Sequence, residues 1–219
     1  MKKILTTLVS VLFAYNIAAA DSTNVGIKLS HAKLSASGSE TQNSGATVTQ
    51  NENDGTFALP SFFVERQIQR SDVFSVSLGL DFVPLTAEVA KLDGTTGFNA
   101  TVSAGNLITA YVQPTYTVSD KLSVFGRLGY SQGDLEVNDF QRQTTTAGTA
   151  STDADPQDKD LKGTVLGLGA QINRDDSMFI RVEATRTDFD EVTHTNSNSK
   201  ILKADAELDL ISFTIGKSF

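Results

Sequence analysis

Two histidines are the side chains of this sequence most suited to acid–base chemistry. His31 and His194 are the only plausible general bases whose ordinary pKa lies near neutrality. His194 stands in the polar stretch 193–197, which also holds a serine and an asparagine. Nucleophile elbows, glycine-rich phosphate loops and zinc-binding spacings are absent from the sequence. The histidines are therefore the starting point for any catalytic hypothesis, and we expect no cofactor.

A run of four aspartates is the second group that could do chemistry. Asp153, Asp155, Asp158 and Asp160 lie within eight residues, and closely spaced carboxylates are the ligands that calcium prefers. The spacing lacks the glycine and the terminal glutamate of the twelve-residue calcium loop. We interpret the run as a solvated loop and expect no metal site.

Composition excludes further classes of function. The chain of 219 residues has no cysteine, so it has neither disulfides nor thiolate chemistry. Its net charge of −8 is unsuited to nucleic acid, because binding to phosphates requires clustered lysine and arginine. We expect no nucleic-acid partner.

The elements that must position these residues are strands, which recur along the chain as segments of alternating apolar and polar residues. In the third segment, Phe74, Leu78 and Phe82 share one face with two further apolar residues, and the opposite face is polar. We predict eight segments, at approximately 25–35, 56–68, 73–83, 107–118, 122–137, 162–173, 178–189 and 206–219. Pro60 and Pro114 fall inside segments, and because proline lacks a ladder N–H we expect bulges or strand ends there.

Short and long connections alternate between these segments. Tight polar turns span residues 69–72, 119–121 and 174–177. Long polar stretches span approximately 36–55, 84–106, 138–161 and 190–205. This strict alternation is typical of transmembrane barrels with short periplasmic turns and long extracellular loops. We therefore predict an all-β fold, an eight-stranded antiparallel up-and-down transmembrane β-barrel.

The amino terminus predicts export. Lys2 and Lys3 precede an apolar run at 4–14 and a small-residue cleavage site at 18–20, the pattern of a secretory signal peptide. We predict a cleaved signal peptide over residues 1–20 and a barrel domain over 21–219. No apolar run in the mature chain is long enough for a membrane helix, so a membrane location requires a closed barrel.

Charged residues of the opposite phase to the apolar ones must point into such a barrel. We predict a lumen network of ion pairs formed by Lys28, Glu65, Asp81, Arg127, Arg181 and Glu183. Unpaired, each buried charge would cost several kcal/mol, so we expect ion pairs and hydrogen bonds. The lumen of eight strands is just wide enough for side chains to fill it, which favours a polar plug over a pore.

The last strand resembles the closing strand of bacterial outer-membrane barrels. It runs from Ile211 to Phe219 and ends in an aromatic residue, and the resemblance implies that the barrel assembly machinery recognises Phe213, Ile215 and Phe219. Lys217 departs from the family pattern, which has an aromatic or apolar residue there. Residues 163–173 and 178–184 likewise look like the penultimate hairpin of this family.

Taken together, these features resemble the small eight-stranded outer-membrane barrels, including the opacity-type surface proteins and the barrel of outer-membrane protein A. The resemblance implies an integral protein of the cell outer membrane with a structural, adhesive or surface-interaction role and no catalysis. Its partners would be outer-membrane lipid, lipopolysaccharide, the assembly machinery and an extracellular ligand at the loops.

Three alternatives stay open from the sequence. A narrow ion channel would use the charged lumen. A lipid-modifying enzyme would use His194, because 193–197 resembles the His and Ser of outer-membrane lipid A deacylases. A soluble lipocalin would carry its apolar face inward, but the tryptophan usual near its first strand is absent.

Overall fold

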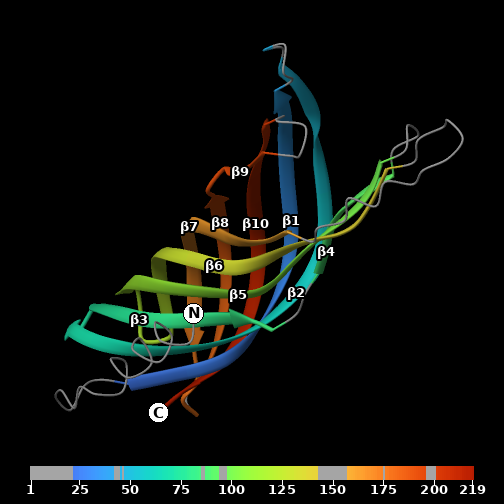
Figure 1. Cartoon of the computed structure of the whole chain (residues 1–219). Coiled ribbons are helices and arrows are strands. Elements are labelled where there is room, and N and C mark those ends of the chain that lie inside the picture. Colours follow the sequence, from blue (N-terminus) through green and yellow to red (C-terminus); the bar gives the residue numbers. More distant parts are fainter. Residues whose placement is uncertain are drawn as a thin grey trace, which may run out of the picture.

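The computed structural model is made of antiparallel strands (Figure 1). It describes residues 22–41, 45, 47–84, 87–93, 98–142, 157–174, 176–195 and 201–219. The strands are β1 (Ser22–Thr41), β2 (Thr47–Ser71), β3 (Phe74–Val83), β4 (Ala87–Asp93), β5 (Phe98–Thr117), β6 (Leu122–Arg142), β7 (Gln157–Asn173), β8 (Met178–Phe189), β9 (Val192–Thr195) and β10 (Ile201–Ser218). Within these ranges, no helix has the length and apolar character needed to cross a membrane.

Eight of the strands close into a ring. The hydrogen-bonded order is β1, β2, β3, β5, β6, β7, β8, β10, and β10 pairs again with β1. That closing seam runs from Asn24 opposite Ser218 to Thr41 opposite Ile201. β4 and β9 lie outside the ring, on β5 and β10 respectively. The predicted closed, eight-stranded antiparallel barrel is confirmed.

The register of the ladder fixes the tilt of the strands. Paired residues on neighbouring strands form a row around the ring. The row that starts at Thr23 of β1 returns to β1 at Lys33, ten residues further along the chain. A stagger of this size in eight strands corresponds to a tilt of about 40–45°, within the usual range for closed barrels. A row of side chains therefore climbs obliquely from one end of the barrel to the other.

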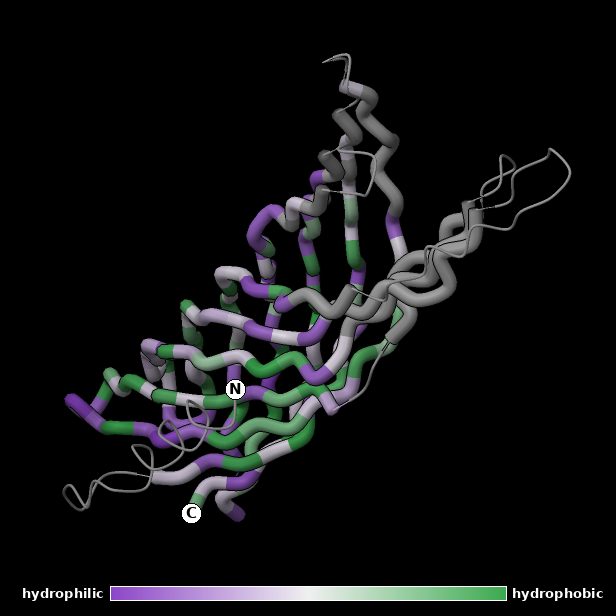
Figure 2. The backbone as a smooth tube through the Cα atoms, in the orientation of Figure 1, coloured by the Kyte–Doolittle hydropathy of each residue, from purple (hydrophilic) through white to green (hydrophobic). Residues whose placement is uncertain are grey.

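The apolar residues face outward, as predicted. Along each strand, side chains that point out of the ring are exposed and mostly apolar, and Figure 2 shows the resulting alternation of hydrophobic and hydrophilic positions. On β1 and β10 the exposed residues include Val25, Ile27, Leu29, Phe213 and Ile215. Exposed side chains of this kind, in a continuous band, match the lipid-facing surface of a transmembrane barrel.

The two ends of the barrel differ. The turn end carries the tight connections and the carboxy-terminus, where Thr23 and Phe219 exchange backbone hydrogen bonds of 2.9 Å. At the opposite, hairpin end, strands extend beyond the ring, and Figure 1 shows the β1–β2 hairpin and the β4–β5–β6 extension leaving in different directions. Much of the sequence predicted as long loops is therefore strand: β2 begins at Thr47, β5 at Phe98 and β7 at Gln157.

The prediction of bulges or strand ends at the two prolines was wrong, because β2 and β5 continue through them without a register shift. Pro60 keeps its register with Leu29 of β1, and pairing of β2 with β3 begins only at Phe62. Pro114 pairs with Val76 of β3, and on its other side the β5–β6 register is the same before and after it. Each missing N–H is thus accommodated where a ladder is interrupted or ends, so no extra residue is needed.

A bulge does occur where β5 changes neighbours. The β5–β6 register shifts between Gly105 and Ile108, and Asn106 adopts a positive φ of 51°. Asparagine is among the residues that tolerate this conformation. β5 pairs with β4 up to Ala104 and with β3 from Leu107, so the bulge marks the junction between barrel and hairpin extension.

Candidate functional site

The lumen is layered along the barrel axis. Read from the turn end, the inward side chains of β1 pass from Asn24 through Lys28 to Ala32, and those of β2 from Gln67 through Glu65 to Leu59. The same order of neutral polar, charged and apolar residues occurs on β3, with Ser77, Asp81 and Val83. The structure therefore stacks a polar cavity, a charged layer and an apolar layer.

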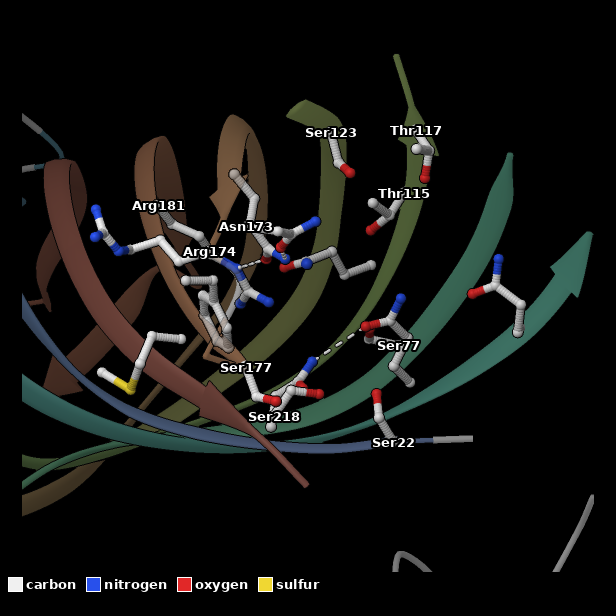
Figure 3. Close-up of a pocket in the computed structure, with 17 residues that line it drawn as sticks. Ser22, Ser77, Thr115, Thr117, Ser123, Asn173, Arg174, Ser177, Arg181 and Ser218 are labelled. Atoms are coloured by element: carbon white, nitrogen blue, oxygen red, sulfur yellow. Dashed lines mark hydrogen bonds between the residues drawn. The ribbon is translucent and has the colours of Figure 1, made fainter. Parts of the chain in front are cut away.

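The polar cavity lies at the turn end and has a volume of about 380 Å³. Its walls are mostly hydroxyl and amide side chains, and Figure 3 shows Ser77, Thr115 and Ser123 on neighbouring strands around it. Arg181 and Phe179 also line it. The amides are tied to one another: Asn24 donates to Gln67 at 3.2 Å, and Gln171 donates to Asn173 at 2.6 Å.

Arg181 organises the first half of the charged layer. Its guanidinium forms a two-pronged ion pair with Glu65, in which Nη1 donates to Oε2 at 3.0 Å, and its Nε donates to Gln171 at 2.6 Å. Glu65 is fully buried and also accepts from Asn24 and from the Tyr111 hydroxyl, both at 2.9 Å. Charge-assisted, bidentate pairs of this kind are the strong ones.

Arg127 organises the second half. Its Nε lies 2.8 Å from Oε1 of Glu183, its Nη1 lies 3.7 Å from Oδ2 of Asp81, and its Nη2 donates to Gln113 at 2.9 Å. Asp81 also forms an ion pair with Lys28. The six residues predicted for the lumen are thus all buried and meet in one layer, with three cations balancing three carboxylates.

Aromatic rings enclose both arginines. The Arg127 guanidinium carbon lies 4.0 Å from the ring centroid of Tyr111. The guanidinium carbon of Arg181 lies 4.6, 5.3 and 5.4 Å from the ring centroids of Phe179, Phe63 and Phe125, respectively. Desolvated cation–π contacts strengthen the hold on a buried guanidinium. None of the four rings was among the residues predicted for the lumen. The signal that could have placed them there is their phase, which is that of the polar residues Glu65, Gln113, Arg127 and Arg181 on the same strands.

Each of these four rings is paired across the ladder with a glycine. Phe63 lies opposite Gly26, Tyr111 opposite Gly79, Phe125 opposite Gly169, and Phe179 opposite Gly216, so every barrel strand takes part once. The ring occupies the space of the missing side chain, because a Cβ on Gly79 or Gly216 would come within 2.2 Å of it. The glycines therefore allow large rings, and through them the arginines, to fit inside a narrow lumen.

The apolar layer closes the hairpin end of the lumen. It consists of buried residues from six barrel strands: Ala32, Leu34, Leu59, Val83, Leu161, Phe189 and Leu208. Partly buried Phe57 and Leu107 pack against it. The predicted polar plug is thus only part of the lumen. The signal that could have revealed this layer is the apolar residue on the polar phase of each segment, such as Leu59 and Phe189.

The other candidate residues lie apart from the lumen. His31 is exposed on the outer face of β1, and Phe213, Ile215 and Phe219 are exposed on the outer face at the closing seam. Asp160 lies 3.4 Å from Lys162 on the outside of β7. Among the described residues no acidic or histidine cluster could hold a metal. The signal peptide, Asp153 and Asp155 lie outside the described residues, as do the side chains of Asp158 and His194.

Comparisons with known proteins agree with this architecture. The model of the outer membrane protein beta-barrel domain family matches residues 4–216. Among curated proteins, no sequence matches.

Solved structures resemble this chain at low sequence identity. Neisserial surface protein A is 9% identical, with 92% of this chain and 100% of that chain covered and a TM-score of 0.50. The attachment invasion locus protein of Yersinia pestis is 9% identical, with 86% and 97% covered and a TM-score of 0.38. The outer membrane protease OmpT of Escherichia coli is 8% identical, with 93% and 99% covered and a TM-score of 0.47. At 9% identity, the likeness to Neisserial surface protein A concerns the fold alone. By the match to almost its whole length, the chain belongs to the outer membrane protein β-barrel family.

Proposed function

We propose that this protein is an integral β-barrel of the cell outer membrane that displays its hairpin extensions to the outside, in a structural, adhesive or surface-interaction role. The signal peptide at 1–20 would direct export and be cleaved. Phe213, Ile215 and Phe219 would guide insertion by the assembly machinery. The outer-membrane lipids, including lipopolysaccharide, would contact the apolar outer face.

The layered lumen is the observation that carries this proposal. A barrel whose interior is filled by paired charges and an apolar layer serves as a scaffold, and the parts left for recognition are those beyond the ring. In this role Lys28, Glu65, Asp81, Arg127, Arg181 and Glu183 act as a structural core with no ligand of their own.

Display of the hairpins can be tested in cells. An epitope inserted at Gly45, between β1 and β2, should be labelled by antibody on intact cells, whereas one in the 119–121 turn should be labelled only after the outer membrane is opened. Labelling of both sites, or only of the turn, on intact cells would refute this orientation. Unboiled protein should also migrate differently from boiled protein in detergent gels.

The interaction role needs its own measurement. Cells that carry the full protein should adhere to host cells or matrix better than cells that carry a barrel with residues 37–50 replaced by a short turn. Equal expression and equal gel mobility of the two proteins provide the control. Equal adhesion would leave a structural role and remove the β1–β2 hairpin as the binding element.

Catalysis is not part of the proposal. A lipid A deacylase activity would depend on His194, so the His194→Ala variant should give the same lipid A profile as the parent protein. A changed profile would overturn the assignment of a noncatalytic role.

A further inference from the structure

Two cations, Arg66 on β2 and Lys217 on β10, lie on the outer face of the barrel near its turn end. From the turn end up to the level where Lys33, Arg186 and Asp209 begin, most other outward positions of the described strands are apolar or small; the exceptions include His31 on β1 and Arg70, which lies in the register shift that ends β2. Both residues have the outward phase: Arg66 lies between Val64 and Ile68, and Lys217 between Ile215 and Phe219.

The ladder brings these two cations to the same place. Both flank β1, since Arg66 is opposite Thr23, and Lys217 is opposite Val25, the next outward residue of the same strand. With strands about 4.8 Å apart, the two backbone positions are separated by about 10–12 Å across β1. Two long side chains on such a separation can both reach a single phosphate.

Local contacts hold the cations at the border of the apolar band. Arg66 Nη1 donates to the Thr23 hydroxyl at 3.1 Å, and Lys217 Nζ lies 5.2 Å from the ring centroid of Phe219. Thr23 and Phe219 form the terminal rung of the ladder at the turn end. The pair therefore lies at the level where lipid headgroups meet the barrel, and not at the centre of the hydrocarbon.

A cation on a lipid-facing strand is costly at the midplane of the membrane and much less so near the interface. Near a membrane each lysine or arginine is attracted to anionic lipid. Because Arg66 and Lys217 flank β1, one anionic headgroup can contact both side chains, and a net-neutral headgroup is attracted less strongly.

We propose that Arg66, Lys217 and Thr23 form a binding site for an anionic phospholipid headgroup, at the β2–β1–β10 face of the turn end. The acyl chains lie against the apolar residues above it, among them Val25, Val64 and Ile215. This inference rests on the proposed orientation, in which the turn end faces the periplasm and the lipid belongs to the inner leaflet of the outer membrane.

The test is lipid retention by the refolded full chain. The protein is prepared in micelles that contain equal amounts of dimyristoyl phosphatidylglycerol and dimyristoyl phosphatidylcholine, and native mass spectrometry counts the retained lipids. The parent protein should prefer phosphatidylglycerol. The variants R66Q and K217Q should each lose about fivefold of this preference, and the double variant should lose most of it.

A matched control separates this site from general charge. K121Q/R174Q removes two cations from the turn end, but these lie in the turns that follow β5 and β7 and not on the lipid-facing strands, so this variant should keep the preference. The mobility of unboiled samples in detergent gels verifies that each variant is folded. Lipid preference is compared among folded variants only. The inference is overturned if the parent shows no preference, or if R66Q/K217Q retains it.

Slower insertion of R66Q/K217Q by the assembly machinery, with lipid preference intact, would instead assign these cations to recognition of the closing strand. A correct epitope orientation combined with absent lipid preference would overturn the lipid site alone. A reversed orientation would overturn the proposed display function.

Discussion

At the scale of single residues, the lumen charges depend on one another. Glu65 neutralises Arg181, receives hydrogen bonds from Asn24 and Tyr111, and has no exposure to solvent. A buried pair contributes modest net stability, but removing one partner leaves the other charge uncompensated. The cost of a substitution therefore depends on whether it breaks a pair or removes it whole.

The Glu65→Gln variant should be destabilised by about 3–5 kcal/mol, because Arg181 would remain charged without its carboxylate. Unfolding by urea in lipid vesicles, followed by circular dichroism, measures this, since the chain has no tryptophan. The double variant Glu65→Gln with Arg181→Met should recover much of the loss. Asp54→Asn serves as the control: it breaks a half-exposed ion pair with Lys33, and it should change the free energy of unfolding far less than Glu65→Gln.

A second residue-scale prediction concerns the surface above the apolar band. Arg186 donates to both carboxylate oxygens of Asp209 at 2.8 Å, which holds the pKa of that carboxyl below its ordinary value of 3.8. This contact stabilises the fold at pH values above the ordinary pKa of the carboxyl. The stabilisation is lost as the pH falls through the lowered pKa of Asp209 in the folded protein. A carboxyl titration by NMR should show Asp209 titrating below 3.8, and Arg186→Gln should raise its pKa. An unchanged pKa in Arg186→Gln would contradict this cause.

At the scale of elements, strand alternation predicted the ring and the phase of each charge. The sequence could not supply the partners of those charges, because partners depend on a register that staggers the strands by ten residues around the ring. The start of β2 escaped prediction because residues 47–55 contain one apolar side chain, Val48, and so show no apolar face. The predictions at Pro60 and Pro114 failed because the sequence does not show whether a proline lies at a gap in the hydrogen-bond ladder or inside a continuous ladder.

The glycine–ring pairs give the element-scale prediction. Gly216→Ala should destabilise the barrel by about 1–3 kcal/mol, because its Cβ would lie 2.2 Å from the Phe179 ring. Gly126→Ala is the matched control, since the nearest atoms to its Cβ lie at 3.9 and 4.0 Å, and it should be tolerated. The measurement is the same urea unfolding. Equal effects of the two substitutions would show that ring packing does not limit position 216.

At the scale of the whole molecule, two successive layers obstruct the lumen. The charged layer spans the barrel beside the cavity, and the apolar layer lies beyond it toward the hairpin end. An ion entering from the turn end would meet paired charges and then a region without polar groups. Loss of one layer leaves the other in place.

The refolded protein should therefore show no unitary conductance in planar bilayers. Arg127→Ser, which thins the charged layer, and Leu208→Ser, which thins the apolar layer, should each stay closed, whereas the combined variant should admit small ions. Gel mobility verifies that each variant is folded. Steady conductance steps from the parent protein would support the channel alternative instead.

The hydrogen bonds between Thr23 and Phe219 make the chain suitable for circular permutation. Since the first and last barrel strands meet on one rung, a few linking residues could join Phe219 to Thr23, and new ends could open at the 119–121 turn without losing a ladder partner. Such a circular permutant would keep all eight barrel strands but would no longer end in phenylalanine. Its ability to refold in detergent, set against its fate in cells, would separate what the barrel needs to be stable from what the cell needs to install it.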